Sequence, residues 1–519
     1  MATATSPHEP PPLHGPTLAL ATIAVSLATF MNVLDTTIAN VSIPTIAGDV
    51  GVSPSQGTWV ITSFAVANAI AVPLTGWLTQ RFGTVRLFVT SVLLFVLASL
   101  ACGLSTSLQM LIVFRVIQGA VAGPMIPLSQ TLLLQSFPRE KSGMALAAWS
   151  MTTLVAPVLG PMLGGWISDN MTWPWIFYIN VPTGLFAAAL SWRLLRHRES
   201  PITKRPVDGI GLALLVIWVG AMQIMLDKGK ELDWFASSEI SLLAITAVVG
   251  FLFFLAWELT DDHPVVDLSL FRSRNFTAGV ICIAFGYGIF FGSVVLMPLW
   301  LQQWLGYTAT WAGLVTAPIG VFALLLSPVV GKTLHKVDPR LFASTSFVIF
   351  AGVSYMRSGF TLDATPWVII LPQLIQGAAT AMFFVPLTAL TLSGLHPSRI
   401  PAAAGLSNFM RMTAAAFGTS LSTTMWDDRA TLHHARLIEN ISVYQPGGPA
   451  AIDLLQAQGL SGEQALAVID RQVSAQAYMM SANDFFALTT VLLLILAAVV
   501  WLAKPQQRPS LAAAADSGH

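Results

Sequence analysis

Apolar residues in this chain come in blocks of about twenty, separated by shorter polar segments. A helix of that length crosses a hydrocarbon core about 30 Å thick. Backbone amides in lipid need hydrogen-bond partners inside their own segment, so each block is predicted to be a helix. The first block is too long for a signal-peptide core, which predicts a retained span. The fourteen predicted spans are 17–39, 58–78, 87–104, 108–131, 145–167, 175–195, 209–226, 240–259, 277–300, 311–330, 341–357, 366–392, 401–426 and 484–503.

The composition agrees with this pattern. Of the 519 residues, 55% are hydrophobic and 10% are charged, whereas soluble domains carry about 25% charged residues. The net charge of +0 gives no indication of a nucleic-acid partner. Cys102 and Cys282 lie inside apolar blocks, which indicates small core residues and no disulfide framework. The chain is therefore predicted to be an all-α polytopic membrane protein.

Lys and Arg residues are distributed unevenly between the segments that alternate along the chain. Most of the 25 fall on the side that holds both chain ends, and the opposite side holds Lys228, Lys230, Arg357, Arg429, Arg436 and Arg471. Because cytoplasmic loops carry an excess of positive charge, both termini are predicted to be cytoplasmic. Two cations, Arg115 and Arg411, lie inside predicted spans.

The two halves of the chain resemble each other. Thr58-Trp59 recurs as Thr310-Trp311, and the run Gln-Gly-Ala at 118–120 recurs at 376–378. Spans 1–6 therefore correspond to spans 9–14 in the same orientation, a known transporter plan with a site between the halves. We expect a tail at 1–16, a six-helix bundle at 17–198, a linker with two inserted helices at 199–275, a second six-helix bundle at 276–503 and a tail at 504–519.

One long loop is predicted at 427–480, on the periplasmic side in this topology. The run Pro-Gly-Gly-Pro at 446–449 predicts a turn, and Ser461 followed by Gln464 has the form of a capping box that opens an amphipathic helix. At about 50 residues the segment is too small for an enzyme domain, so a docking surface or a lid is the expected role.

Asp35 is the only acidic residue that falls well inside a predicted span, and Arg115 lies at a similar depth in span 4. At 1.5 Å per residue their depths agree within about 3 Å. Burial favours the protonated carboxyl and a nearby guanidinium favours the charged one, so small helix movements would change the proton affinity. We expect Asp35 to couple transport to protons with Arg115 as its partner; the alternative is a static ion pair.

Arg411 lies about ten residues into span 13, with Asn408 one helical turn before it. A cation at that depth is expected to face a cavity, where it would hold an anionic substrate or compete with the proton. The alternative is pairing with a carbonyl or a helix C-terminus. We expect soft and aromatic side chains to line the cavity beside it. The predicted cavity residues are Met31, Asn32, Thr36, Trp149, Phe285, Tyr287, Asn408 and Arg411.

Several strings resemble motifs of the major facilitator superfamily. Residues 76–86 resemble its loop signature, with Gly76, Arg81, Gly83 and Arg86 as predicted cytoplasmic gate residues; Gln80 stands where the family usually has Asp. Residues 156–165 resemble the antiporter motif, which is typical of exporters. The motif residues are Pro157, Gly160, Pro161, Gly164 and Gly165. Residues 34–44 resemble the signature of the fourteen-span drug:proton antiporters, and 56–64, 173–182 and 266–271 resemble the EmrB group of multidrug exporters.

The resemblance implies a major facilitator fold, two six-helix bundles plus two inserted helices, in the bacterial inner membrane. It further implies export of hydrophobic toxic compounds in exchange for protons. The implied partners are a periplasmic adaptor of EmrA type and an outer-membrane channel of TolC type. The alternative is a dedicated exporter of an endogenous metabolite or fatty acid.

A membrane-embedded enzyme or a channel is disfavoured, because titratable residues do not cluster at one depth. No catalytic residues, metal site or cofactor are expected, with the proton gradient as the energy source. Gly331-Lys332-Thr333 lacks the earlier glycine of a phosphate loop. Adjacent His433 and His434 are expected to be solvated.

Overall fold

The computed structural model describes residues 11–203, 208–261, 264–439 and 447–505, and these form helices without any strand. The first group of helices, here the N-terminal group, comprises α1 (Gly15–Asp49), α2 (Pro54–Gly57), α3 (Trp59–Ala71), α4 (Thr75–Phe82), α5 (Thr84–Gly103), α6 (Leu108–Ala122), α7 (Met125–Ser136), α8 (Ser142–Asn170), α9 (Trp175–Tyr178) and α10 (Asn180–Leu195). An inserted pair follows, α11 (Gly209–Lys228) and α12 (Ser238–Thr260). The C-terminal group comprises α13 (Arg274–Gln303), α14 (Ala309–Thr316), α15 (Pro318–Thr333), α16 (Pro339–Arg357), α17 (Pro366–Leu392), α18 (Ile400–Glu439), α19 (Gly447–Ala457) and α20 (Gly462–Val499).

Every predicted span is helical, although some are broken. Ten described helices are long and apolar enough to cross a membrane, or eleven if α3 and α4, bent by 63° at their break, form one span. The other predicted spans correspond to α8, α16 and α18. Three further predicted spans are each formed by two consecutive helices, which are α6–α7, α9–α10 and α14–α15.

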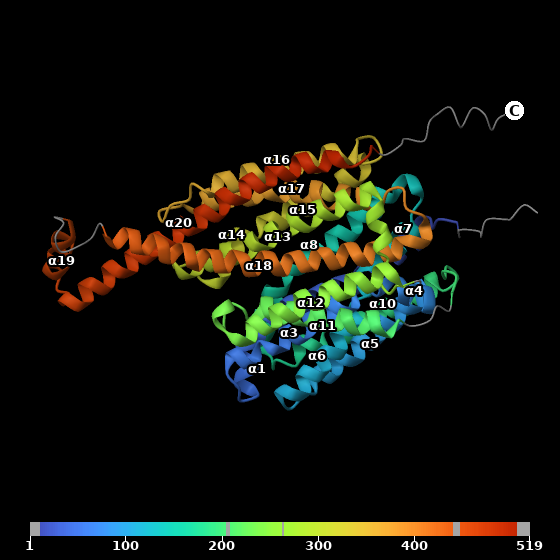
Figure 1. The fold of residues 1–519 in the computed structure, drawn as a ribbon, viewed down its shortest axis with the longest axis horizontal. Helices are drawn as coiled ribbons and strands as arrows, with labels where there is room; N and C mark the ends of the chain where they lie inside the picture. The colour runs from blue at the N-terminus through green and yellow to red at the C-terminus, as the bar shows by residue number, and fades with distance from the viewer. Residues whose placement is uncertain (1–10, 204–207, 262–263, 440–446, 506–519) are drawn as a thin grey trace, which may run out of the picture.

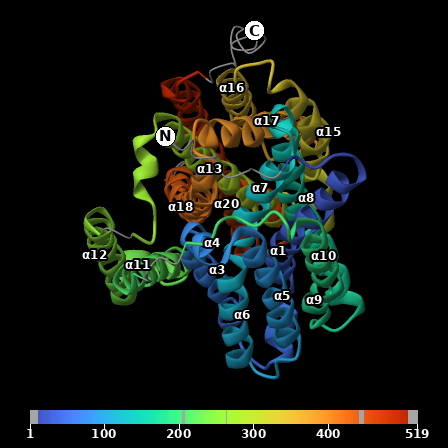
Figure 2. The same cartoon turned by 90° about the vertical axis from the view of Figure 1, so that its right-hand side faces the viewer.

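Each group of helices has its own hydrophobic core. One core is built by α1, α5, α7, α8 and α10, and another by α13, α16, α17 and α20. A third core joins the inserted pair to α3, α13 and α18, and its centre is Trp218 packed edge-on against Phe409. Figure 2 shows the inserted pair at one side of the bundle.

The two groups touch at the end of the bundle where α1 begins and α20 finishes, here the terminal end (Figure 1). A Cβ atom on Gly76 of α4 would lie 2.5 Å from the Cβ of Ala402 of α18. A Cβ on Gly143 would lie 2.4 Å from the backbone oxygen of Gly331. Because glycine alone permits such backbone approach, the terminal end is closed between the two groups.

The prediction that residues 427–480 form a loop is wrong. Helix α18 continues to Glu439 and α20 begins at Gly462, so most of this segment extends the two spans as a hairpin of helices. His433 Nε2 lies 2.8 Å from Asp484 Oδ2, and Trp426 Nε1 donates to the backbone oxygen of Tyr478 at 2.9 Å. Figure 1 shows the hairpin, with α19 at its tip, projecting beyond the bundle at the opposite end, here the hairpin end.

The capping box in this segment is confirmed, because Ser461 and Gln464 exchange both hydrogen bonds at the start of α20. The turn expected at 446–449 is not found at 447–449, where α19 begins; Pro446 lies outside the described residues. Helix α1 also runs through Pro44 to Asp49, beyond the span end expected near 39.

The packing of α8 on α1 yields a test of the fold. A Cβ on Gly160 would lie 2.0 Å from Thr37 Oγ1, whereas a Cβ on Gly165 of the same helix meets nothing within 4 Å. We expect Gly160→Ala to destabilise the protein by about 1–3 kcal/mol through overpacking, and Gly165→Ala to leave stability nearly unchanged. Thermal unfolding of both purified variants in detergent measures this. Equal melting temperatures for the two variants would contradict the close α1–α8 contact.

Candidate functional site

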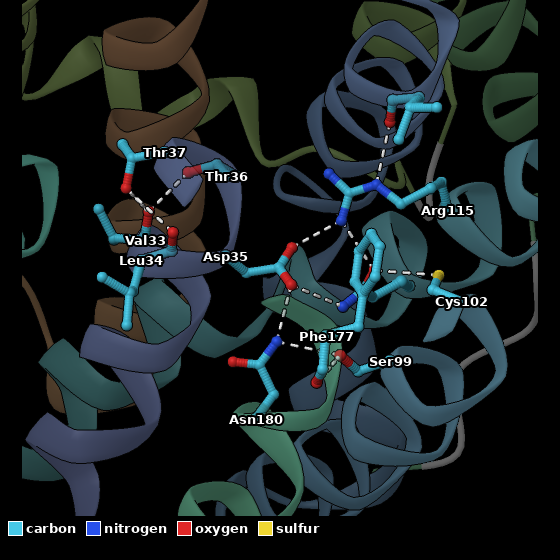
Figure 3. A network of polar contacts seen from close by, with 12 residues as sticks. Val33, Leu34, Asp35, Thr36, Thr37, Ser99, Cys102, Arg115, Phe177 and Asn180 are labelled. Atoms are coloured by element: carbon cyan, nitrogen blue, oxygen red, sulfur yellow. Dashed lines mark hydrogen bonds and ion pairs between the residues drawn. The ribbon is translucent and has the colours of Figure 1, made fainter. Parts of the chain in front are cut away.

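A buried ion pair lies in the core of the N-terminal group. Asp35 of α1 is 2% exposed, Arg115 of α6 is fully buried, and Arg115 Nη1 donates to Asp35 Oδ2 at 2.6 Å (Figure 3). The structure thus brings together the two side chains that the sequence placed at similar depth. Their role in proton coupling stays a prediction.

Both members of the pair have further partners. Arg115 Nε donates to the Val60 oxygen at 2.9 Å, and Nη1 also donates to Gln118 Oε1 at 2.8 Å. Asp35 Oδ1 accepts from Asn180 Nδ2 at 2.7 Å and from Gln118 Nε2 at 3.2 Å (Figure 3). The network therefore joins α1, α3, α6 and α10, and it satisfies the carboxylate with three donors.

The surroundings of this network are apolar. The Arg115 guanidinium lies 4.2 Å from the centre of the Phe64 ring and 5.6 Å from that of Phe177. A buried pair of this kind contributes little net stability, but removing one partner leaves an uncompensated charge, at a cost of about 3–5 kcal/mol. The two side chains are therefore strongly interdependent.

Glycines position the helices that carry the pair. A Cβ on Gly119 of α6 would lie 2.4 Å from the Phe64 oxygen of α3, so α6 comes close enough for Arg115 to reach Val60. On the other side, Gly160 and Gly164 of the antiporter-like motif pack on Thr37 and Ile38 of α1.

The rest of the motif makes less specific contacts. Gly165 faces open space, and Pro157 lies within the continuous helix α8. The side chain of Pro161 lies outside the described part of the structure.

The predicted gate residues lie at the terminal end. Gly76 contacts Ala402, and Gly83, with φ of +85°, ends α4 in a conformation that favours glycine. Arg81 lies over the Trp77 ring at 5.6 Å. Arg86, the fourth gate residue, is exposed, and its guanidinium lies 3.9 Å from a Glu199 oxygen.

Glu199 contacts the predicted gate segment and was missed by the sequence analysis. It accepts from the backbone N–H groups of Val85 and Arg86, each at 2.9 Å, and so caps the N-terminus of α5. A carboxylate in the short segment after span 6 was the available signal. Glu199 thus brings a carboxylate to the segment 76–86, in which Gln80 stands where the family usually has Asp.

The predicted cavity residues separate into distinct places. Trp149, Tyr287, Asn408 and Arg411 come together where the two groups of helices meet; the Arg411 guanidinium lies 5.2 Å from the Trp149 ring and 5.0 Å from the Tyr287 ring. The other cavity predictions lie elsewhere. Met31 packs beside Gly184 inside the N-terminal group, and Asn32 donates to the Ala122 oxygen at 3.3 Å.

One of these predictions is corrected. Phe285 is 63% exposed on the outer surface of α13 and does not line a cavity. Met31 is 1% exposed and belongs to the same hydrophobic core as Trp149, so its place in a cavity stays a prediction. Thr36, on α1, donates its hydroxyl to the Val33 oxygen of its own helix at 2.7 Å.

Arg357 ends α16, as the predicted span 341–357 has it, but its surroundings differ from the expectation. It was counted with the cations of the periplasmic side, whereas it is only 2% exposed. Its guanidinium donates to Gln376 Oε1 and lies 5.6 Å from the Phe486 ring. A second buried acid lies near a span end: Glu258, close to the end of α12, is 4% exposed and accepts from the Val266 N–H.

Comparison with known proteins agrees with this architecture. The family model described as Major Facilitator Superfamily matches residues 25–419. The chain is 54% identical to the multidrug export protein EmrB of Escherichia coli strain K12 over 499 residues, which covers 95% of this chain and 97% of that protein. It is 49% identical to the fatty acid resistance protein FarB of Neisseria gonorrhoeae, covering 95% of this chain and 98% of FarB.

Among solved structures, the human organic anion transporter MFSD10 matches with a TM-score of 0.55 at 14% identity, covering 92% of this chain and 100% of that one. At this identity the match shows a shared fold. It confirms the predicted fold class.

The ion pair generates a test of stability. Arg115→Gln leaves the Asp35 carboxylate buried without its cation, so we expect a loss of about 3–5 kcal/mol. The double variant Asp35→Asn with Arg115→Gln removes both charges and is expected to recover much of that loss. Arg86→Gln, at an exposed pair, should change stability by less than about 1 kcal/mol. Thermal unfolding of the purified variants compares them. A single Arg115→Gln variant as stable as the double variant would show that the two charges are not interdependent.

Proposed function

The chain belongs to the major facilitator superfamily, and on that premise we propose that it exports structurally varied hydrophobic compounds across the bacterial inner membrane in exchange for protons. The observation that carries the proposal is 54% identity to a multidrug export protein across nearly the whole of both chains. The packing of the antiporter-like glycines Gly160 and Gly164 against the helix that holds Asp35 supports the exchange mechanism.

In this mechanism Asp35 carries the proton and Arg115 responds to it. A proton arriving from the periplasm neutralises Asp35 and weakens the 2.6 Å contact. Arg115 keeps the Val60 and Gln118 oxygens as acceptors, so its charge is not left without partners. This second set of acceptors favours a switch over a static pair, because either state of Asp35 leaves the cation hydrogen-bonded. Helices α1 and α6 then shift, and substrate binding favours proton loss to the cytoplasm.

Alternating access follows from one group of helices rocking against the other. The glycine contacts of Gly76 with Ala402 and of Gly143 with Gly331 would separate when the terminal end opens. With both termini cytoplasmic, the described conformation is closed to the cytoplasm. The proton gradient is then the only energy source, and the protein acts as a transporter without catalytic residues or a cofactor.

The helical hairpin supports a role for partners. In the proposed orientation α19 and the extensions of α18 and α20 project into the periplasm (Figure 1). We propose that they contact a periplasmic adaptor of EmrA type, which leads to an outer-membrane channel of TolC type. His433 and His434 each pair with a different carboxylate, Asp484 and Asp470, and these pairs join α18 to α20. His433 is only 8% exposed, so the expectation that it is solvated is wrong.

A second candidate function is the export of one endogenous metabolite or fatty acid. The 49% identity to a protein named for fatty acid resistance favours it. Proteoliposomes tested against a panel of unrelated hydrophobic compounds separate the two functions, since a dedicated exporter would move one member and leave the others.

Removing the coupling carboxylate tests the mechanism. We expect Asp35→Asn to abolish dye transport driven by a pH gradient in inverted vesicles while substrate binding persists, because the variant cannot exchange a proton. The control is Asp49→Asn on the same helix, where the carboxylate accepts from Trp173 Nε1 at the hairpin end. The control should transport at the wild-type rate. Uphill transport by the Asp35→Asn vesicles with normal pH dependence would make Asp35 structural.

Shortening the hairpin tests the partner proposal. His434 Nε2 lies 3.1 Å from Asp470 Oδ1, so a short Gly-Ser linker in place of residues 437–467 joins two helices that are already adjacent. We expect cells with this variant to lose drug resistance, while inverted vesicles containing only this protein keep proton-driven transport. If vesicle transport also disappears although the protein is folded, the hairpin belongs to the transport cycle.

A further inference from the structure

Arg411 is a buried cation with no counter-charge in the part of the chain that the structure describes. It lies in the membrane-spanning part of α18 and is 6% exposed. Arg115 has Asp35 as its partner and Arg357 donates to Gln376, but Arg411 makes no ion pair or hydrogen bond with any described residue. A charge at this depth costs about 2.5–3.5 kcal/mol on insertion scales, and here no fixed acceptor offsets that cost.

The cation lies where the two groups of helices meet. Trp149 comes from α8 of the N-terminal group and Tyr287 from α13 of the C-terminal group, and both rings lie about 5 Å from the guanidinium carbon. One turn before Arg411, Asn408 donates to Gln130 Oε1 of α7 at 3.2 Å, which also links the two groups. Movement of one group against the other would therefore take Trp149 away from Arg411 and uncover the guanidinium.

Two donors at this place have no acceptor in the described structure. They are the Nε–H of Arg411 and the Nε1–H of Trp149, both fully buried. Leaving a buried donor unpaired costs about 1–3 kcal/mol, and more for a charged group. The two donors and the positive charge suit a carboxylate or another oxyanion, which accepts hydrogen bonds and donates none.

A cluster of aromatic side chains begins beside the cation. The Tyr287 ring lies 4.5 Å from that of Phe291 and 5.6 Å from that of Phe384, and Phe290 continues the cluster at 6.3 Å from Tyr287. A ligand with an acidic group on Arg411 would place an attached ring or chain against these aromatic side chains. The arrangement fits a compound that is charged at one end and hydrophobic over the rest.

We propose that Arg411, together with the Trp149 N–H, binds the acidic group of exported compounds, so that lipophilic organic anions form a preferred substrate class. The proposal rests on the export function proposed above and deepens it. The anion site lies apart from the Asp35–Arg115 pair, on residues that the ion-pair network does not contact. Neutral compounds would therefore still be exported when Arg411 is replaced. The name of the relative FarB refers to fatty acids, which are compounds of this class.

The test compares two probes of nearly the same shape, 2-naphthylacetate and the neutral 2-naphthylacetamide. Calorimetric titration of the full chain in lipid nanodiscs measures the affinity for each. We expect the wild type to prefer the anion, and Arg411→Gln to weaken anion binding by about tenfold or more with amide binding nearly unchanged, as for loss of a charged hydrogen bond. Trp149→Phe keeps the ring, removes one donor and should weaken anion binding by a smaller factor. Arg429→Gln, in the exposed part of the hairpin, is the control and should bind both probes normally.

Equal affinity of the wild type for both probes, or no measurable binding of either, would overturn the anion site. So would an equal loss of both affinities in the Arg411→Gln and Trp149→Phe variants. Retained amide binding shows that a variant is folded. Transport of a neutral dye in vesicles distinguishes failure of the anion site from failure of the proposed export function. Transport by Arg411→Gln would support export whatever affinities the two probes show. Absence of transport by the wild type would contradict the export function itself.

Discussion

The structure of the N-terminal group depends on one constraint, that a charge buried at membrane depth needs a partner. Arg115 Nη1 donates to Asp35 Oδ2 at 2.6 Å. Arg115 also donates to the backbone oxygen of Val60, and Asp35 accepts from the side chains of Gln118 and Asn180. These contacts require α1, α3, α6 and α10 to converge. Gly119 permits the close approach of α6 to α3, and Gly160 permits α8 to pack closely on α1, because a Cβ atom at either position would clash with the neighbouring helix. The motif typical of exporters thus has a physical role: it holds the helix that carries the carboxylate.

The two halves of the internal repeat share the contacts of a repeated glutamine but differ in their buried charged residues. Gln118 and its counterpart Gln376 both bond to a side chain of the preceding long helix, Cys102 of α5 in one half and Arg357 of α16 in the other. The C-terminal group places its buried cations, Arg357 and Arg411, without a carboxylate partner among the described residues. In the proposed mechanism the proton site therefore lies within the N-terminal group, and the anion site lies at the interface between the two groups, around the Arg411 side chain of the C-terminal group.

Much of this was predictable from the sequence, and the failures have physical causes. The spans and the shared depth of Asp35 and Arg115 follow from helix rise and from the cost of charge in lipid. Phe285 was predicted wrongly because lipid and an apolar cavity favour the same side chains. Hydrophobicity alone therefore cannot distinguish the outer face of α13 from the face that points into the bundle. The burial of Arg357 was not predicted, because its position at the end of a span does not show that its long side chain turns inward. The hairpin was missed because its helices are held by pairs such as His433 with Asp484, which are 51 positions apart in the chain.

The most direct test of the account is to count protons during substrate binding. Purified protein in weakly buffered detergent solution, with a pH indicator, is mixed with a saturating neutral substrate. If Asp35 is the coupling group, the wild type releases protons when substrate binds. The Asp35→Asn variant should bind the same substrate and release none. Equal proton release from the two proteins would contradict the central claim, because the proton would then come from another residue.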